Sequence, residues 1–196
     1  MTGRRELAIF LVPAAVLVLV VVGVVALLIV RSGEAAQPTV GLTAVATLES
    51  PAGEYMGTVT FRQAASGVLI MADVKGLAPG GHAFIIHETG SCTPHFSAAG
   101  DHFNPADTEH GFVHSSWKGA DSGQGHSGDL PNIYAASDGS ARADFFTSGI
   151  TLEMGPGHSV FDADGSAIIV HENPDAYGEE ETDTGTRLAC GVIRGT

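Results

Sequence analysis

The sequence predicts an all-β domain, an antiparallel sandwich or barrel, that follows an apolar N-terminal segment. Beyond residue 39 the chain alternates between short apolar segments and turns rich in glycine, proline and aspartate. No segment beyond residue 31 shows a sustained helical period. Many short strands separated by turns are typical of antiparallel sandwiches and barrels.

The first element is residues 7–30, which are 24 consecutive residues without a charged side chain. A helix of about 20 apolar residues spans a bilayer, and Arg4 and Arg5 before it favour a cytoplasmic N-terminus. We therefore expect residues 1–31 to be a single-pass anchor in the cell membrane, with the remainder on the extracytoplasmic side. A cleaved signal peptide is the alternative, and the domain would then be periplasmic or secreted.

After a short polar linker, residues 32–39, the domain occupies residues 40–196. Seven segments have the length and composition of strands, namely residues 40–49, 57–63, 67–76, 82–88, 140–148, 167–172 and 189–194. Two long stretches, 89–130 and 172–187, are rich in glycine, serine and acidic residues. Loops of this length within a compact domain are uncommon and are usually functional.

The charge and the cysteines limit the partners and the compartment. Once residues 1–31 are set aside, 6 of the chain's 9 basic and 21 of its 22 acidic side chains remain, a formal net charge of −15. Nucleic acid is therefore not expected as a partner, because phosphate binding requires the opposite sign. The two cysteines, Cys92 and Cys190, would usually pair outside the cytoplasm; two free buried thiols are the alternative.

All nine histidines lie between residues 82 and 171. One group on the first long loop has the spacing His-x7-His-x15-His-x2-Asp and consists of His102, His110, His126 and Asp129. Three imidazoles and one carboxylate can complete a tetrahedral shell around zinc. Such a site would order a glycine-rich loop that has few apolar side chains, so we predict a structural zinc site.

A second group combines the sheet with the same loop. His87 and His171 each end a predicted strand, and His102 lies on the loop between them. Imidazole nitrogens suit copper, so these three residues are the predicted copper ligands. His102 would belong to both groups through its two ring nitrogens.

Longer motifs resemble copper/zinc superoxide dismutases and occur in the order found in that family. They are HETGSC at 87–92, SAAGDHFNP at 97–105, HSGDL at 126–130, DADGSAIIVHENPD at 162–175 and RLACGVI at 187–193. The resemblance covers roughly residues 40–195. It implies an eight-stranded antiparallel Greek-key barrel with two long functional loops, and it implies disproportionation of superoxide to oxygen and hydrogen peroxide.

The resemblance also implies a role for each matching metal ligand. His110, His126 and Asp129 match zinc ligands, and His102 matches the imidazolate that bridges the two metals. His87 and His171 match copper ligands.

Further residues match positions around the metals. Arg187 matches the cation that orients superoxide, so Arg187 and His102 would act in catalysis. Cys92 and Cys190 match the intrachain disulfide. Asp175 matches an aspartate outside the metal shell that links a zinc histidine to a copper histidine.

One position departs from the pattern of the family. The motif has a copper-ligating histidine two residues before His87, where this chain has Ile85. Alternate residues of a strand share a face, so Ile85 points toward the copper position and offers it only hydrocarbon. His82 has an odd offset and faces the other side, whereas His95 or water could supply a fourth ligand. We expect copper to bind weakly or not at all.

Two functions follow from these observations. The first is a superoxide dismutase at the outer face of the membrane, with activity reduced by Ile85. Residues 172–186 contain no lysine or arginine, so Arg187 alone would attract the anion. The second is a non-catalytic, zinc-stabilised barrel that binds copper weakly. The resemblance also allows a homodimer, because family dimers form through an apolar sheet face.

Overall fold

The computed structural model describes residues 39–111, 125–178 and 183–196. The predicted anchor, residues 1–31, and most of the linker lie outside these ranges, so they stay predictions, as does a homodimer. Across the described ranges, no helix has the length and apolar character needed to cross a membrane.

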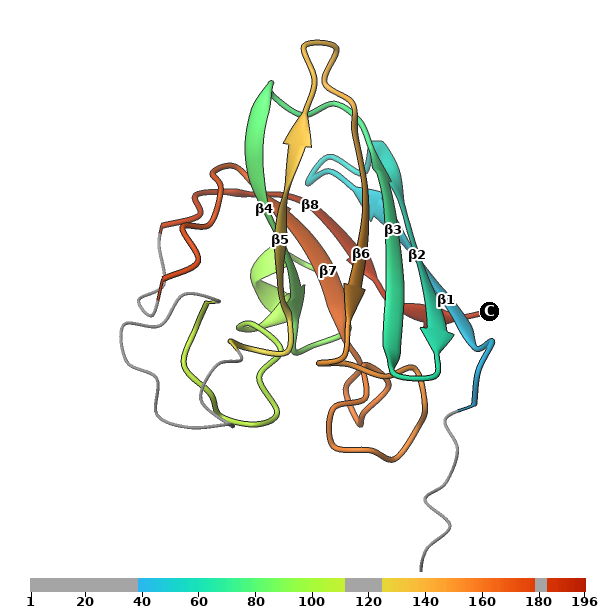
Figure 1. Cartoon of the computed structure of the whole chain (residues 1–196). Coiled ribbons are helices and arrows are strands. Elements are labelled where there is room, and N and C mark those ends of the chain that lie inside the picture. The colour runs from blue at the N-terminus through green and yellow to red at the C-terminus, as the bar shows by residue number, and fades with distance from the viewer. Residues whose placement is uncertain (1–38, 112–124, 179–182) are drawn as a thin grey trace, which may run out of the picture. The chain divides into compact units, whose positions relative to one another are not determined.

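One antiparallel sheet curls into a nearly closed barrel (Figure 1). Its strands are β1 (Thr43–Glu49), β2 (Tyr55–Ala64), β3 (Gly67–Val74), β4 (Gly80–His87), β5 (Asp129–Ala135), β6 (Ala141–Thr147), β7 (Ala167–His171), β8 (Arg187–Val192) and the short β9 (Arg194–Gly195). The hydrogen-bonded order is β5-β4-β7-β8-β1-β2-β3-β6, and β9 pairs with β1. Contacts between β5 and β6 bring the two ends of this order together. The predicted all-β, eight-stranded antiparallel barrel is therefore confirmed.

The connections explain how distant segments become neighbours. After β3 the chain forms β4 and β5 on the far side of the barrel and then returns, so that β6 pairs with β3. A strand that returns beside an earlier one after intervening strands is the connection found in Greek keys. As a result, β4 and β7, which are far apart in the sequence, lie side by side.

All seven predicted strands are present, but the prediction missed β5. Proline cannot donate to a strand ladder, so Pro131 argues against a strand in the sequence. In the structure β5 ends the hydrogen-bonded order, Pro131 is exposed, and the pairing with β4 shifts register beside it. Both long loops end earlier in the structure than predicted, because Asp129 already belongs to β5 and Arg187 already belongs to β8.

Strand alternation separates the core from the face that carries the histidines. Phe84 and Ile86 of β4, together with Ile168 and Val170 of β7, belong to the main hydrophobic core. The residues between them therefore lie on the opposite face of the sheet. On β4 and β7 these are Ile85, His87, Ala167, Ile169 and His171.

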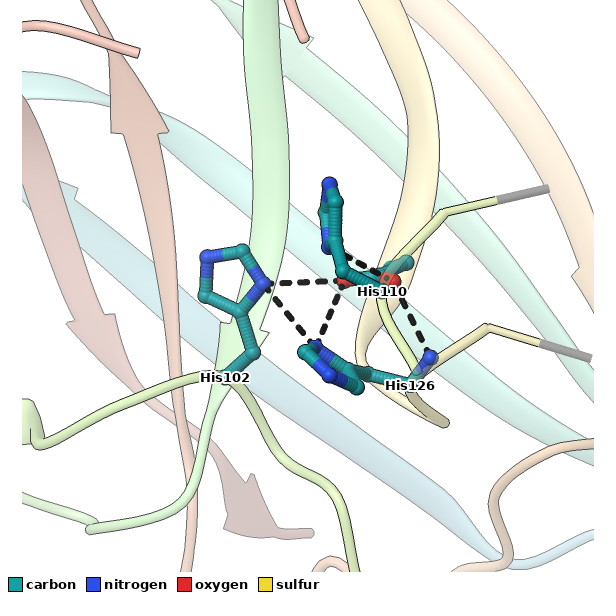
Figure 2. A group of neighbouring side chains, drawn as sticks. His102, His110 and His126 are labelled. Atoms are coloured by element: carbon teal, nitrogen blue, oxygen red, sulfur yellow. Dashed lines mark hydrogen bonds and ion pairs between the residues drawn. The ribbon is translucent and has the colours of Figure 1, made fainter. Parts of the chain in front are cut away.

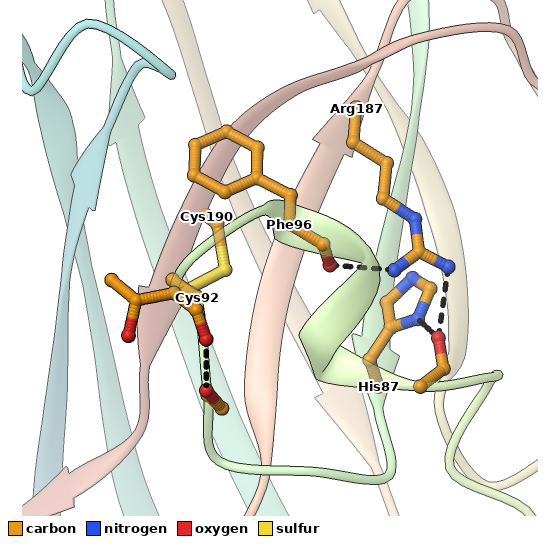
Figure 3. The surroundings of a disulfide bond; sticks show 8 residues. His87, Cys92, Phe96, Arg187 and Cys190 are labelled. Carbon is orange, nitrogen blue, oxygen red and sulfur yellow. Dashed lines mark hydrogen bonds between the residues drawn. A yellow bond between two sulfur atoms is a disulfide. The ribbon is translucent and has the colours of Figure 1, made fainter.

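The predicted disulfide is confirmed, since Cys92 is bonded to Cys190 of β8 (Figure 3). The bond ties the loop after β4 to the sheet. Both cysteines join a small apolar cluster with Ile169 and with Phe96, which opens the short 3-10 turn η1 (Phe96–Ala99). The first part of the long loop is thus fixed beside the histidine-bearing face.

Candidate metal centre

Four side chains of the first long loop and β5 meet in one place (Figure 2). One ligand atom from each lies within 4.8 Å of the others, and the residues are His102, His110, His126 and Asp129. Asp129 is central, because His102 Nδ1 lies 2.9 Å from its Oδ1 and His110 Nδ1 lies 3.0 Å from its Oδ2. The structure therefore groups all four predicted zinc ligands as a possible metal site.

The backbone around Asp129 fixes this group. The N–H groups of Gly111 and His126 each donate to Asp129 Oδ2 at 3.0 Å. Gly111 has a φ of +86°, and a Cβ there would lie 2.2 Å from the carbonyl oxygen of Gly178. Glycine is required at this position because the two long loops meet there.

The electrostatics of the group fit a cation. Burial alone would raise the pKa of Asp129, but hydrogen bonds from His102, His110 and His126 outweigh it and hold the pKa well below its ordinary value. The hydrogen bond to Asp129 raises the pKa of His110 to about 9. Asp129 is therefore a permanent buried anion around which the three imidazoles gather.

The spacing of the nitrogens fits zinc. Two nitrogens about 2.0–2.1 Å from zinc at a tetrahedral angle lie about 3.3–3.4 Å apart, and His102 Nδ1 and His126 Nδ1 are 3.3 Å apart. The buried His110 Nδ1 also faces Asp129 and lies 3.0 Å from its Oδ2. A bound zinc ion would replace the proton between these two atoms, because a ligating imidazole must be neutral.

The predicted copper side contains a second close pair. His87 Nε2 and His171 Nε2 are 3.3 Å apart, and the His102 ring stands edge-on to His87 with 5.3 Å between ring centroids. His87 Nδ1 donates to the carbonyl of Gly100, which leaves its Nε2 free to bind a metal. Burial, reinforced by the charge of Arg187, lowers the pKa of His87 to about 2 and that of His171 to about 4. Both imidazoles are therefore neutral, which is the metal-binding form.

Ile85 lies on the same face of β4 as His87. It pairs with Asp129 on one side and with Ile169 on the other, and its exposure is 1%. The side chain where the family pattern has a ligand is therefore a buried hydrocarbon. His82 does not replace it, because its two ring nitrogens lie 2.8 Å from the carbonyl oxygens of Ala78 and His171.

Arg187 is held beside His87 (Figure 3). Its Nη1 donates to the Phe96 carbonyl at 2.7 Å, and its Nη2 donates to the Gly100 carbonyl at 2.8 Å. The Gly100 carbonyl also accepts from His87 Nδ1. The cation, the histidine and the disulfide-bonded loop therefore share one hydrogen-bond network.

His95 and the acidic loop have other positions. His95 is exposed and lines a groove of about 490 Å³ beside the disulfide, together with Cys92 and Arg187. It does not belong to the grouped ligands found among the described residues. Residues 179–182 of the acidic loop lie outside those residues, whereas Asp183 is described and is exposed.

The second long loop reaches the zinc group through Asp175. A carboxylate oxygen of Asp175 lies 3.1 Å from His110 Nε2. The side chain of Asn132 holds Asp175, because its Oδ1 accepts from the Asp175 N–H and its Nδ2 donates to the Asp175 carbonyl. The Asn132 N–H in turn donates to the Tyr177 hydroxyl at 2.6 Å. Asn132 and Tyr177 are not predicted from the sequence, because neither residue type is a usual zinc ligand.

The Tyr177→Phe variant should be less stable than the wild type. It removes the acceptor of the Asn132 N–H, and a buried backbone donor without a partner costs about 1–3 kcal/mol. Urea unfolding of the zinc-loaded protein should show this loss. Tyr134→Phe is the control, because Tyr134 is on the same strand as Asn132 but is 70% exposed. Equal stability of the two variants would contradict the role assigned to Tyr177.

Comparisons with known proteins agree on one family. The family model described as Copper/zinc superoxide dismutase (SODC) matches residues 55–193. The superoxide dismutase (Cu-Zn) of Caulobacter vibrioides is 41% identical over 156 residues, which cover 78% of this chain and 86% of that protein. The extracellular superoxide dismutase (Cu-Zn) of Brugia pahangi is 34% identical over 161 residues, covering 77% and 75% of the two chains.

Solved structures give the same result. A SOD-like protein from Bacillus subtilis superposes with a TM-score of 0.67 at 32% identity, covering 76% of this chain and 96% of its own. A double mutant of that protein, with two introduced histidines, has a TM-score of 0.68 at 34% identity and covers 76% and 95%. At these identities the likeness extends beyond the fold to the sequence.

Proposed function

The chain belongs to the copper/zinc superoxide dismutase family, and we propose that it disproportionates superoxide outside the cytoplasm at a copper site of three histidines. One observation carries this proposal: His87 Nε2 and His171 Nε2 are 3.3 Å apart beside His102, whose Nδ1 belongs to the zinc group. The turnover should be well below that of a site with four nitrogen ligands, because of Ile85.

Each part of the site has a task in this proposal. Zinc, held by His102, His110, His126 and Asp129, would stabilise the loop. Copper, held by His87, His102 and His171, would supply the redox chemistry, accepting an electron from one superoxide and donating one to another. The proteins named among the relatives as Cu-Zn enzymes support this choice of metals.

Arg187 would attract and orient superoxide. Its guanidinium is fixed by two backbone carbonyls next to His87, so the positive charge stays at the site when no substrate is bound. A preorganised cation stabilises an anion without having to move at the moment of reaction. Formation of hydrogen peroxide also requires protons, and the His102 ring, with a side-chain exposure of 11%, is the ligand we propose for their delivery.

The location outside the cytoplasm is part of the proposal. Residues 7–30 are long and apolar enough for a membrane anchor. The Cys92–Cys190 disulfide supports an oxidising compartment. The Brugia pahangi relative is named as extracellular.

The Ile85→His variant tests the activity. We expect it to remove superoxide roughly 100-fold faster than the wild type, because a fourth nitrogen completes the tetragonal field that Cu(II) prefers. Full-length protein in detergent, loaded with zinc and copper, would be assayed for metal content and for superoxide removal. Ile85→Val is the matched control and should behave like the wild type. A wild-type rate equal to that of Ile85→His would show that Ile85 does not limit turnover.

A second function, a non-catalytic zinc-stabilised barrel, is favoured by the buried hydrocarbon at position 85. In the same experiment it predicts full zinc, little copper and no superoxide removal by the wild type. Measurable copper-dependent turnover by the wild type would exclude it.

A further inference from the structure

The proposed copper side contains three imidazole rings whose orientations are fixed by contacts of their Nδ1 atoms. His87 Nδ1 donates to Gly100, and His102 Nδ1 belongs to the zinc group, so the Nε2 atom of each is the one left for a second metal. His171 Nε2 lies 3.3 Å from His87 Nε2, while its Nδ1 lies 3.0 Å from the Thr184 hydroxyl. The donor set of this side is therefore three imidazole nitrogens.

The next positions on the same face are hydrocarbon. Ile85 is two residues before His87, and Ile169 is two residues before His171; these two isoleucines pair with each other across β4 and β7. Their exposures are 1% and 0%, and neither belongs to the main core of the barrel. A branched aliphatic side chain has no electron pair to donate, so this wall adds no ligand to the three nitrogens.

The charge around the three nitrogens opposes a highly charged ion. The Arg187 guanidinium and His87 share the Gly100 carbonyl. The positive charge of Arg187 is therefore fixed beside the His87 ring. The carboxylates of Asp129 and Asp175 are engaged with His102 and His110. Coulomb repulsion from a fixed cation is twice as large for a dication as for a monocation.

We infer that this site is selective for Cu(I) over Cu(II) and that Ile85 is the residue that sets this preference. Cu(II) prefers four nitrogen or oxygen ligands in a tetragonal field. Cu(I), with a filled d shell, has no such preference and accepts three nitrogens. The inference rests on the proposed function only in taking copper as the metal, and it names the oxidation state that the site holds.

The selectivity is measurable without any turnover. Full-length, zinc-loaded protein in detergent would be titrated with Cu(I) under anaerobic conditions and separately with Cu(II), each against a competing chelator of known affinity. Ile85→His should bind Cu(II) at least roughly 100-fold more tightly than the wild type. Loss of a hydrogen-bond partner outside the metal shell already changes metal affinity about 10- to 100-fold, and a direct ligand should contribute at least as much. The Cu(I) affinity of Ile85→His should change by less than about tenfold, because three nitrogens already suffice. Ile85→Val, which keeps the hydrocarbon wall, should retain the wild-type ratio.

Two results would overturn the inference. One is the same ratio of Cu(II) to Cu(I) dissociation constants in the wild type, Ile85→Val and Ile85→His. The other is a wild-type protein that binds neither ion while its zinc content is complete. If Ile85→His does not fold, electron paramagnetic resonance of the wild type with added Cu(II) decides, because a tetragonal four-nitrogen signal would overturn the inference and its absence, with Cu(I) bound, would support it.

Failure of the inference and failure of the proposed function have different signatures. If the wild type removes superoxide, and the ratio of Cu(II) to Cu(I) dissociation constants is the same in the wild type and in Ile85→His, the inference is wrong and the dismutase proposal stands. A Cu(I)-selective protein that does not remove superoxide would end the dismutase proposal and leave the inference in place.

Discussion

Replacing Asp129 with alanine should release zinc and destabilise both long loops. Asp129 is fully buried, contacts His102 and His110, and accepts hydrogen bonds from two backbone N–H groups. Removing one partner of a buried ion pair costs about 3–5 kcal/mol. Loss of a residue that only hydrogen-bonds a metal ligand already weakens metal binding about 10- to 100-fold. Loss of a ligand itself should therefore weaken zinc binding by roughly 1,000-fold or more.

Chelator competition for zinc, and urea unfolding with and without zinc, would measure both effects. Asp129→Asn separates charge from shape, because the amide oxygen can still accept from the Gly111 and His126 N–H groups. Compared with Asp129→Ala, Asp129→Asn should be more stable without metal but should bind zinc little better. Asp144→Ala, at an exposed position on β6, is the control for removing a carboxylate. Zinc affinity in Asp129→Ala within tenfold of that control would contradict the assignment of Asp129 as a ligand.

Removing the disulfide should cost nearly as much stability. Cys92 and Cys190 are 98 residues apart, and the chain-entropy estimate for a loop of about this size is about 4.7 kcal/mol. The bond also holds the loop whose Phe96 and Gly100 carbonyls fix Arg187. We therefore expect the Cys92→Ala/Cys190→Ala double variant to lose about 3–5 kcal/mol of unfolding free energy.

Urea unfolding at fixed zinc concentration would give this loss, because bound zinc itself stabilises the folded state. Ser97→Ala, at an exposed position of the same loop, is the matched control. A double variant that is less stable than that control by under about 1 kcal/mol would mean that the loop is held by the packing of Phe96 in the cluster of Ile169 rather than by the covalent bond.

The sequence was most informative where a local pattern has a direct structural meaning. Turn residues between short apolar segments predict seven of the eight barrel strands. The spacing of His102, His110, His126 and Asp129 predicts a group that the structure brings together. The period of two along β4 places Ile85 on the same face as His87, and the pairing of Ile85 with Asp129 and Ile169 agrees with this.

Other features depend on contacts between distant segments and leave no local pattern. Pro131 argues against a strand in the sequence, but the end of the hydrogen-bonded order tolerates it in β5. The Tyr177 hydroxyl accepts a hydrogen bond from Asn132 of another segment, and Asn132 holds Asp175 beside His110. The hydrogen bond from the Asn132 N–H to Tyr177 could not be predicted, because a backbone hydrogen bond to a tyrosine hydroxyl has no signature in residue type.

The sequence by itself determined the class of fold, the family and the set of possible ligands, because strand alternation, turn residues and long motifs are local properties of the chain. Only the tertiary structure decided which atoms face one another: that His87 Nε2 meets His171 Nε2, that Arg187 shares the Gly100 carbonyl with His87, and that His95 lies in an exposed groove. The reason is that these contacts form when β4, β7 and β8 align across the barrel, and their geometry depends on strand register and loop closure together.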